Sequence, residues 1–414
     1  MSRQSGEIGE SINLQAVRES IPALARLVHD KPLVYLDAAA TTPRPQAVID
    51  AVANYESTFP ANVHRGVHTL SGEATAAYEN AREHIATFLG ADSPELIFTR
   101  GTTEAINLVA GSWATAHLKA GDEILISVLE HHANIVPWQM LCERLGTHLR
   151  VADVTDAGDL TVAAVESAIT PNTRLIAMTC VSNAIGTVTP IVDVCALAKS
   201  RGIVSLIDAA QMTPHMPVDF HSLGCDFLAF SGHKMYGPTG IGGLLGRSEM
   251  LASMPPWQGG GDMIRTVTLE GSTWNDVPWK FEAGTPNIGG TIGLAAAVEW
   301  LDTIGLDAIG IREQGLLDEA VKRLQSIDRL QLVGEPTERA GAISFIIDGM
   351  HPADIGAMLD RHGIAIRAGH HCAQPALHRF GQTTTARIAP AFYNTSTELE
   401  TLETAIRRII DVFG

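Results

Sequence analysis

Two apolar runs that each stop at a polar residue constrain this chain more than any other feature. The runs Val204–Ile207 and Asp226–Phe230 have the length and composition of buried strands. The first stops at Asp208, and the second stops at the segment Ser231–Lys234. Ligands of an open parallel sheet bind outside the carboxyl ends of its strands. We therefore expect Asp208 and Lys234 to face one shared pocket.

Pyridoxal 5'-phosphate is a ligand that uses an aspartate and a lysine together. The lysine holds its aldehyde as a Schiff base, and the carboxylate keeps its ring nitrogen protonated. In the same stretch, Gln211 is placed to bind the ring hydroxyl, and Ser231 and His233 are placed to bind the phosphate. Taken singly, a strand-end aspartate is usually a turn or cap residue, and a lysine usually points to solvent. Because Asp208 and Lys234 each follow a predicted strand, the two together favour a pyridoxal phosphate site.

A threonine-rich turn predicts a second contribution to the phosphate site. The segment Arg100–Glu104 lies between a predicted strand at 95–99 and a predicted helix at 105–118. Gly101, Thr102 and Thr103 present backbone N–H groups and hydroxyls to an anion, and the helix dipole assists them. The alternative is a simple threonine cap with a glutamate behind it.

Two polar residues follow other strands of the expected sheet. His131 follows the strand at 123–127 and is placed to stack on a flat ring and to move protons. Asn183 follows the strand at 174–181, so its amide is expected to reach the ligand from the same edge. The pair His131 and His132 could instead bind a metal, but no carboxylate or cysteine cluster at ligand spacing accompanies them. We predict no metal site.

The stretch 364–375 carries the candidate nucleophile. Cys372 lies on a loop just after a predicted strand, beside His370 and His371 and close behind Arg367. A thiolate nucleophile needs basic neighbours and access to small molecules. The alternative is that His370, His371 and Cys372 bind a metal, but side chains of adjacent residues rarely point at one ion. Arg367 and the later Arg387 are each able to clamp a carboxylate.

The remaining cysteines and the overall charge exclude several classes of protein. The other four cysteines lie in apolar or helical patterns and form no CxxC pair, so we expect neither disulfides nor a zinc motif. The net charge of -17 disfavours nucleic-acid binding. The chain has no apolar stretch long enough for a membrane span and begins without the pattern of a secretion signal, which predicts a cytoplasmic protein.

Strands and helices alternate along most of the chain before residue 246. This alternation predicts an α/β fold with a doubly wound, mostly parallel sheet covered on both faces. A first helix is expected at 12–29, and an irregular hairpin and loop at 255–290. Beyond residue 296 we expect a smaller α+β domain with helices at 308–326, 352–361 and 396–413 and strands at 330–333, 342–347 and 364–367. We assign 31–295 to a large cofactor-binding domain, and 1–30 with 296–414 to the small domain that carries the cysteine loop.

Nine motifs in order along the chain carry a resemblance to a known family. They are YLDAAATTPRP, ANVHRGVHTLSG, FTRGTTEAINLVA, EHHANIVPWQ, SNAIGT, IDAAQ, SGHKMYGPTGIG, FEAGTPN and RAGHHCAQP. With these motifs the sequence resembles the SufS/CsdA-type, or group II, cysteine desulfurases of the class V aminotransferase family. The resemblance covers nearly the whole chain.

The resemblance implies a homodimer of fold-type-I subunits that bind pyridoxal phosphate at the dimer interface. It implies that Lys234 is the Schiff-base lysine and that Cys372 is the nucleophile that forms a persulfide. By the same resemblance, the ring is held by His131, Asp208 and Gln211, and the substrate carboxylate by Asn183, Arg367 and Arg387. The resemblance assigns the phosphate to Thr103, Ser231 and His233 with Thr285 from the other subunit, and the threonine turn adds Thr102 to the candidates. One departure is Ile388-Ala389-Pro390 after Arg387, where related sequences often have a serine.

The activity implied is the conversion of L-cysteine to L-alanine, with the sulfur passed from Cys372 to an acceptor. The acceptor would resemble SufE or SufU, and the sulfur would serve iron-sulfur cluster assembly. One alternative is a selenocysteine lyase acting on L-selenocysteine. Others are a further class V enzyme, such as a kynureninase or an epimerase, and a scaffold protein whose own activity is vestigial.

Overall fold

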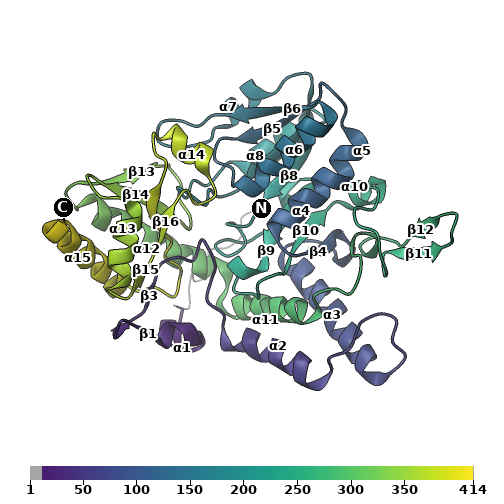
Figure 1. Cartoon of the computed structure of the whole chain (residues 1–414), viewed down its shortest axis with the longest axis horizontal. Coiled ribbons are helices and arrows are strands. Elements are labelled where there is room, and N and C mark those ends of the chain that lie inside the picture. Colours follow the sequence, from purple (N-terminus) through teal and green to yellow (C-terminus); the bar gives the residue numbers. More distant parts are fainter. Residues whose placement is uncertain (1–11, 414) are drawn as a thin grey trace, which may run out of the picture.

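The computed structural model describes residues 12–413, which form a large seven-stranded sheet, a small four-stranded sheet and three two-stranded sheets (Figure 1). Strands β5 to β9 of the large sheet are parallel, and β10 runs antiparallel to both of its neighbours. The doubly wound, mostly parallel sheet is therefore confirmed. In spatial order the strands are β4 (Leu96–Thr99), β10 (Gly242–Gly246), β9 (Phe227–Ser231), β8 (Val204–Asp208), β7 (Thr173–Thr179), β5 (Glu123–Ser127) and β6 (His148–Ala152).

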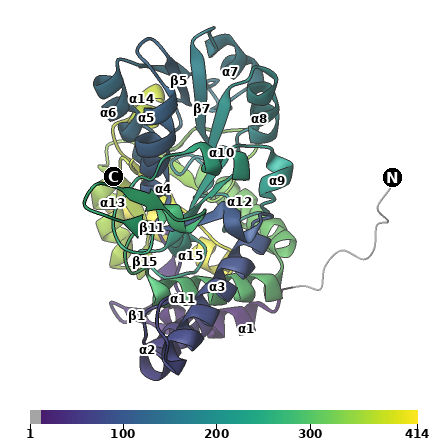
Figure 2. The same cartoon turned by 90° about the vertical axis from the view of Figure 1, so that its right-hand side faces the viewer.

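Side chains of the central strands alternate between two hydrophobic clusters. Leu206 and Ala229 pack on one face of the sheet, whereas Ile207 and Leu228 pack on the other. Both faces are covered because both are apolar. Figure 2 shows β5 and β7 between α5 and α6 on one side and α8 on the other. The helices around this sheet are α2 (Gln46–Thr58), α3 (Thr69–Phe88), α4 (Thr102–Val109), α5 (Thr115–His117), α6 (Val136–Leu145), α7 (Val162–Ala168), α8 (Ile191–Ser200), α9 (Phe220–Leu223), α10 (Ser248–Ser253) and α11 (Ile288–Ile304).

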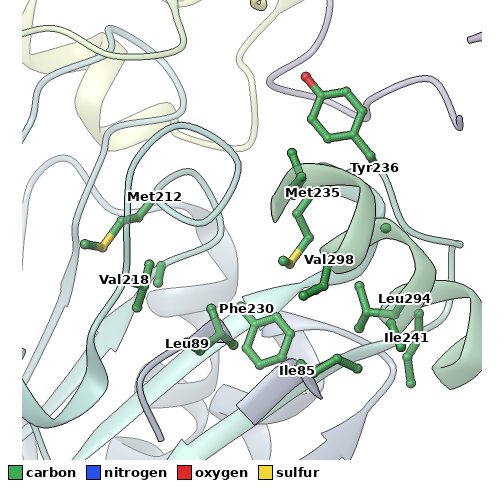
Figure 3. Close-up of a cluster of buried hydrophobic side chains, with 14 of the residues drawn as sticks. Ile85, Leu89, Met212, Val218, Phe230, Met235, Tyr236, Ile241, Leu294 and Val298 are labelled. Carbon is green, nitrogen blue, oxygen red and sulfur yellow. The ribbon is translucent and has the colours of Figure 1, made fainter. Parts of the chain in front are cut away.

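The chain just after Lys234 is anchored in the hydrophobic core. Met235 and Tyr236 are 0% and 1% exposed, and Figure 3 shows Met235 beside Val298 of helix α11. Phe230, at the end of β9, belongs to the same cluster. The lysine turn is therefore fixed by packing on both of its sides.

The small sheet is antiparallel and follows the order β13, β14, β17, β16. Its core includes Phe345 of β14 and Ile406 of the last helix. The limits of the two domains stay a prediction. Strand β3 lies within the range 31–295 assigned to the large domain, but it pairs with β15 and packs in the core of the small sheet. The elements are β3 (Val34–Tyr35), α12 (Leu306–Gln325), β13 (Leu330–Val333), β14 (Ile343–Ile347), α13 (Pro352–Asp360), β15 (Ile364–Ala365), β16 (Arg367–Gly369), α14 (Gln374–Arg379), β17 (Thr385–Ile388) and α15 (Ser396–Phe413).

Three sequence predictions about local structure are wrong. The helix expected at 12–29 is only α1 (Leu14–Glu19), because Pro22 holds Ile21 in an extended conformation and a 3-10 turn and the hairpin β1 (Leu27–Val28) and β2 (Lys31–Pro32) follow. The helix expected at 105–118 starts at Thr102 and contains a π-helical turn at Ala110–Ala114. The strand expected at 364–367 is divided, since β15 pairs with β3 and β16 pairs with β17.

Strand β10 was missed because its glycines weaken the strand pattern. A Cβ atom at Gly242 would lie 2.4 Å from the carbonyl oxygen of Phe230 and 2.7 Å from the Cα of Gly101. Glycine is therefore required for the close approach of β10 to β9 and to the turn before α4. The expected hairpin in 255–290 is present as β11 (Ile264–Val267) and β12 (Ser272–Trp274). None of the described helices combines the length and hydrophobicity needed to cross a membrane.

Candidate active site

A cavity of about 180 Å³ lies at the carboxyl ends of β8 and β9, where residues of the two sheets meet. Residues from as far apart in the sequence as Ala39 and Arg387 line it. Every site residue predicted from the sequence lines this cavity except Thr285, namely Thr102, Thr103, His131, Asn183, Asp208, Gln211, Ser231, His233, Lys234, Arg367, Cys372 and Arg387.

Asp208, which is buried, and Lys234, which is half-buried, are the charged residues at the strand ends. Asp208 is the last residue of β8 and accepts a hydrogen bond of 3.0 Å from the backbone N–H of Ala210. Burial lowers the pKa of Lys234 to about 8, although the charge of Asp208 opposes this shift. Burial also raises the pKa of Asp208, and here the charge of Lys234 opposes the shift. Burial thus shifts each group toward its neutral form, and the opposite charge of the other group moderates the shift.

The phosphate site predicted from the threonine turn has the features of an anion cradle. Thr102 is the first residue of α4, and Gly101 before it has a φ of 146°. The hydroxyl of Ser231 accepts a 2.9 Å hydrogen bond from the backbone N–H of Thr102 and lies 2.9 Å from its hydroxyl. A Cβ atom at Gly101 would lie 3.0 Å from that Ser231 hydroxyl. Strand β9 and helix α4 therefore bring small polar groups to one point.

His131 and Gln211, the residues expected to contact a ring, both line the cavity. Burial and the charge of Lys234 lower the pKa of His131 to about 3, so the imidazole is neutral at pH 7. Its Nδ1 accepts a 3.0 Å hydrogen bond from the backbone N–H of Ala133. Gln211 is buried and donates a 2.7 Å hydrogen bond to the carbonyl of Ala39. Its side chain is thereby fixed at the wall of the cavity.

Glu130 is a buried acid beneath His131 that the sequence analysis did not select. Its carboxylate accepts hydrogen bonds of 2.5 Å from the Ser127 hydroxyl and 2.7 Å from the Asn134 amide. Burial raises the pKa of Glu130 to about 7, against the effect of these hydrogen bonds. The network anchors the turn that presents His131. A Glu-His pair after a strand is too common a pattern to indicate this role.

The two arginines lie together at the small-sheet side of the cavity. Arg387 is 2% exposed, and its Nη1 donates a 2.7 Å hydrogen bond to the carbonyl of Asn183. Its Nε is buried without a partner among the described residues. Burial lowers the pKa of Arg387 to about 10, so it stays positive at pH 7. Asp37, which the sequence did not single out, accepts hydrogen bonds from Arg387 and Arg367.

Cys372 lies on an exposed turn whose backbone is held from several sides. Both His371 and Cys372 have left-handed backbones, with φ values of 53° and 55°. The Asn183 amide donates a 2.5 Å hydrogen bond to the carbonyl of His371, and the backbone N–H of His132 donates a 2.7 Å hydrogen bond to the carbonyl of Cys372. Non-glycine residues adopt this conformation only where their surroundings enforce it. The turn therefore presents the thiol in a defined place.

His132 also meets this turn through its side chain, which the sequence pattern did not indicate. Its Nε2 accepts a 3.2 Å hydrogen bond from the backbone N–H of Gln374. One ligand atom from each of His132, His370 and Cys372 lies within 4.8 Å of the others. The Nδ1 of His370 accepts a 3.0 Å hydrogen bond from the backbone N–H of Cys372. A metal-binding histidine normally donates its second N–H group to an acceptor. In His132 and His370 a ring nitrogen instead accepts a hydrogen bond from the backbone of the turn, so these contacts favour a structural role in the turn over metal binding. The absence of a metal stays a prediction.

Thr285 lies outside the cavity formed by its own chain. It lines a separate cavity of about 490 Å³ with Arg100 and Asn287, and its hydroxyl accepts a 3.4 Å hydrogen bond from the Asn62 amide. Its expected role at the site of a second subunit cannot be fulfilled within one chain and stays a prediction.

The residues present fit pyridoxal phosphate. The cradle of Thr102, Thr103 and Ser231 at a helix N-terminus suits a phosphate monoester. A buried acid at the end of β8 suits a protonated ring nitrogen, and a lysine with a lowered pKa suits an aldehyde. The unpartnered, buried Nε of Arg387 suits a carboxylate.

Comparisons with known proteins agree with this geometry. The family model for class V aminotransferases matches residues 34–402. A cysteine desulfurase of Klebsiella pneumoniae (strain 342) is 50% identical over 406 residues, which are 98% of this chain and 100% of that protein. The solved structure of the cysteine desulfurase CsdA (S-sulfonic acid) from Escherichia coli has a TM-score of 0.90 and 39% identity over 97% of this chain and 100% of its own. The apo structure of a cysteine desulfurase from Thermococcus onnurineus NA1 has a TM-score of 0.92 and 38% identity over 98% and 100%.

These likenesses cover the region that contains every residue of the cavity. The chain therefore belongs to the class V aminotransferase family and, within it, to the pyridoxal-phosphate-dependent cysteine desulfurases, as the sequence predicted.

Proposed function

We propose that this enzyme moves the sulfur of L-cysteine onto Cys372 as a persulfide and releases L-alanine. One observation carries the proposal: Cys372 lines the same cavity as Lys234 and Arg387. Of the five cysteines, all in the described part of the chain, Cys372 alone is exposed. A sulfur taken up there is accessible both to substrate and to a later acceptor.

The residues have separate roles in binding. Lys234 would hold the cofactor aldehyde, Asp208 would pair with the ring nitrogen, and His131 would stack on the ring. The bound cofactor supplies an electron sink that stabilises negative charge at the substrate Cα. The substrate carboxylate would bind Arg387 through its free Nε, with Arg367 and Asn183 beside it. With a pKa of about 8, Lys234 is poised to accept and return a proton near neutral pH once its amine is free.

Sulfur transfer follows when the Cys372 thiolate attacks the substrate Sγ. A new S–S bond forms, the substrate Cβ–Sγ bond breaks, and the electron pair of that bond passes to the carbon skeleton. The carbon takes a proton and becomes the methyl group of alanine. The two sulfurs end as a persulfide, so the carbon is reduced as the sulfur is oxidised.

The test is the Cys372→Ser variant of the holoenzyme with L-cysteine as substrate. We expect the wild type to give equal amounts of alanine and of persulfide on Cys372, measured by amino-acid analysis and mass spectrometry. The variant should release almost no alanine from L-cysteine. The matched control is Cys142→Ser on helix α6, where the thiol lies away from the cavity. Full desulfurase turnover by Cys372→Ser would contradict the proposal, and preferential turnover of L-selenocysteine by that variant would favour the lyase alternative.

We further propose that the enzyme is a homodimer in which Thr285 serves the phosphate site of the partner. Two observations support this. Thr285 lies outside its own cavity, and the hairpin of β11 and β12 leaves Val267, Leu269 and Trp274 60%, 103% and 45% exposed. Analytical ultracentrifugation should give a dimer, and Thr285→Ala should weaken cofactor binding. A monomer with full cofactor affinity would contradict this proposal.

The persulfide is proposed to pass to a SufE-like or SufU-like acceptor for iron-sulfur cluster assembly. The exposed Cys372 turn supports this, because a bulky partner can reach it. Turnover should rise when such an acceptor is added and should stay unchanged with an acceptor whose own cysteine is replaced. A cytoplasmic location stays a prediction.

A further inference from the structure

A chain of buried hydrogen bonds runs through the small sheet behind the Cys372 turn. The Ser344 hydroxyl of β14 donates a 2.7 Å hydrogen bond to the carbonyl of Ala184, which lies in the loop after β7. The Thr385 hydroxyl of β17 donates a 3.1 Å hydrogen bond to Ser344 Oγ, and His371 Nε2 lies 2.8 Å from Thr385 Oγ1. All three side chains are buried. The chain thus joins the loop after β7 to the residue that precedes Cys372.

The order of donors in this chain fixes the tautomer of His371. A carbonyl oxygen only accepts hydrogen bonds, so the single proton of the Ser344 hydroxyl is used on Ala184. Ser344 Oγ then accepts from Thr385, which uses the single proton of that hydroxyl. Thr385 Oγ1 is therefore left to accept from His371, and the imidazole carries its proton on Nε2.

The surroundings of His371 keep the ring neutral. Burial lowers the pKa of His371 to about 3, and the charges of Arg387 and Arg367 act in the same direction. Its Nδ1 is buried without a partner among the described residues. The one hydrogen bond of the ring goes to Thr385, which does not line the cavity. The side chain of His371 is thus anchored to the interior of the small sheet.

The main chain at His371 is anchored to the same region. The Asn183 amide donates a 2.5 Å hydrogen bond to the carbonyl of His371. Gly369, two residues earlier, pairs with Thr385 in the register of β16 and β17. The left-handed backbone at His371 and Cys372 persists only where the surrounding structure enforces it. The residue before the nucleophile is therefore held through both its side chain and its carbonyl.

We propose that Ser344, Thr385 and His371 form a relay of hydrogen bonds that positions the Cys372 thiol for sulfur transfer. His371 is then a positioning residue, which acts on the turn through its Nε2–H group and is not the base that takes the thiol proton. The inference deepens the proposed function and rests on it in taking Cys372 as the nucleophile.

The variant Thr385→Val tests the relay, because valine keeps the shape of the side chain and removes its hydroxyl. Two quantities are measured on the holoenzyme. One is the single-turnover rate of persulfide formation from L-cysteine, and the other is the hydrogen–deuterium exchange rate of the amides at 371–374 without substrate. Because a buried donor left without an acceptor is costly, persulfide formation should be about tenfold slower and exchange about tenfold faster. The cofactor absorbance should be unchanged, since Thr385 does not line the cavity.

A conservative variant and a matched control accompany this test. Thr385→Ser restores the hydroxyl, so both quantities should return close to those of the wild type. Thr401→Val removes a hydroxyl at an exposed position on α15 and should leave both unchanged. A general loss of stability would not be rescued by the smaller serine.

Two variants of His371 separate the roles of its two nitrogens. Glutamine can place an amide N–H group near the position of Nε2, whereas asparagine is one methylene shorter and mimics only Nδ1. We expect His371→Gln to stay close to the wild type in both quantities and His371→Asn to resemble Thr385→Val. This pair decides the matter if Thr385→Val does not fold.

Wild-type values of both quantities in folded Thr385→Val, or in His371→Asn, would overturn the inference. Persulfide formation as slow in His371→Gln as in His371→Asn would also overturn it, because Nδ1 would then be the required group. The exchange measurement needs no sulfur transfer, so it is separate from a failure of the desulfurase assay. A protein that shows the expected exchange pattern but forms no persulfide would refute the proposed function and leave the relay intact.

Discussion

The two sides of the cavity are built from different kinds of structure. On the large-sheet side, Asp208 and Lys234 lie at the ends of parallel strands, and their pKa values are shifted mainly by desolvation. On the small-sheet side, Cys372 lies on an exposed turn that is held by hydrogen bonds from His132 and Asn183. One side is fixed by packing and the other by polar contacts between distant segments.

This difference indicates a division of labour. Burial tunes the acid and the base that activate the substrate carbon, because it penalises their charged forms. An exposed turn suits the group that must meet a second macromolecule, since sulfur has to leave the cavity. Variants of the first side should therefore impair cofactor attachment and the carbon chemistry, whereas variants of the polar contacts around Cys372 should slow sulfur transfer and leave cofactor binding intact.

Lys234→Ala should have the largest effect. It removes both the cofactor attachment and the base, and we expect turnover to fall about 10⁴-fold, the upper range for a group in proton transfer. Alanine release and persulfide formation should be lost together. The control is Lys119→Ala at an exposed position. If Lys234→Ala still released alanine, the large-sheet side of the cavity would not control the carbon chemistry.

Asp208→Asn should have the next largest effect. The amide keeps the size of the side chain but cannot compensate a protonated ring nitrogen, so kcat should fall about 10²-fold, as for the loss of one electrostatic contact. The absorbance of bound cofactor against pH should change as well, whereas the thermal unfolding midpoint should not fall markedly. A variant with normal kcat and an unchanged spectrum would show that Asp208 has only a structural role.

The buried side could be predicted from sequence because its signals are local. Asp208 and Lys234 follow apolar runs, and parallel strands bring their carboxyl ends to one edge wherever they pair. This rule alone predicts that the two residues line one cavity. The prediction failed locally at β10, where glycines weaken the strand pattern, at Pro22, and at α4, which starts at Thr102 and continues into a π-helical turn.

The contacts of the exposed side could not be predicted, because they join residues far apart in the chain. His132 meets Gln374 across 242 positions, and Asp37 meets Arg387 across 350 positions. No periodicity links such pairs, and their chemistry appears only after both sheets have formed. The residue pattern and the resemblance each selected Cys372 and Arg387 as candidates, but neither predicted the contacts that hold them.

The variant His132→Ala tests the polar contacts that hold the exposed Cys372 turn. The variant loses the hydrogen bond from the Gln374 N–H, although the backbone bond from His132 to Cys372 can persist. One net hydrogen bond is worth ~1 kcal/mol, so persulfide formation should slow about five- to tenfold. Cofactor binding should be unchanged. His148→Ala, at an exposed position on β6, is the control. A loss of cofactor affinity in His132→Ala would mean that the two sides are not separate.

The smallest effect we predict concerns the pH dependence of cofactor binding to cofactor-free protein. Only a neutral Lys234 amine can attack the aldehyde, and burial lowers the pKa of this amine to about 8. The rate of reconstitution should therefore rise roughly fivefold between pH 7 and pH 8 and level off above pH 9, because the neutral fraction then approaches its limit. In Asp208→Asn the carboxylate that opposes the shift is absent, so the midpoint should move to lower pH. Stopped-flow absorbance measures both curves. The rate of reductive methylation of Lys119 gives the reference for an exposed amine. A midpoint that does not move would mean that Asp208 and Lys234 do not act as an interacting pair.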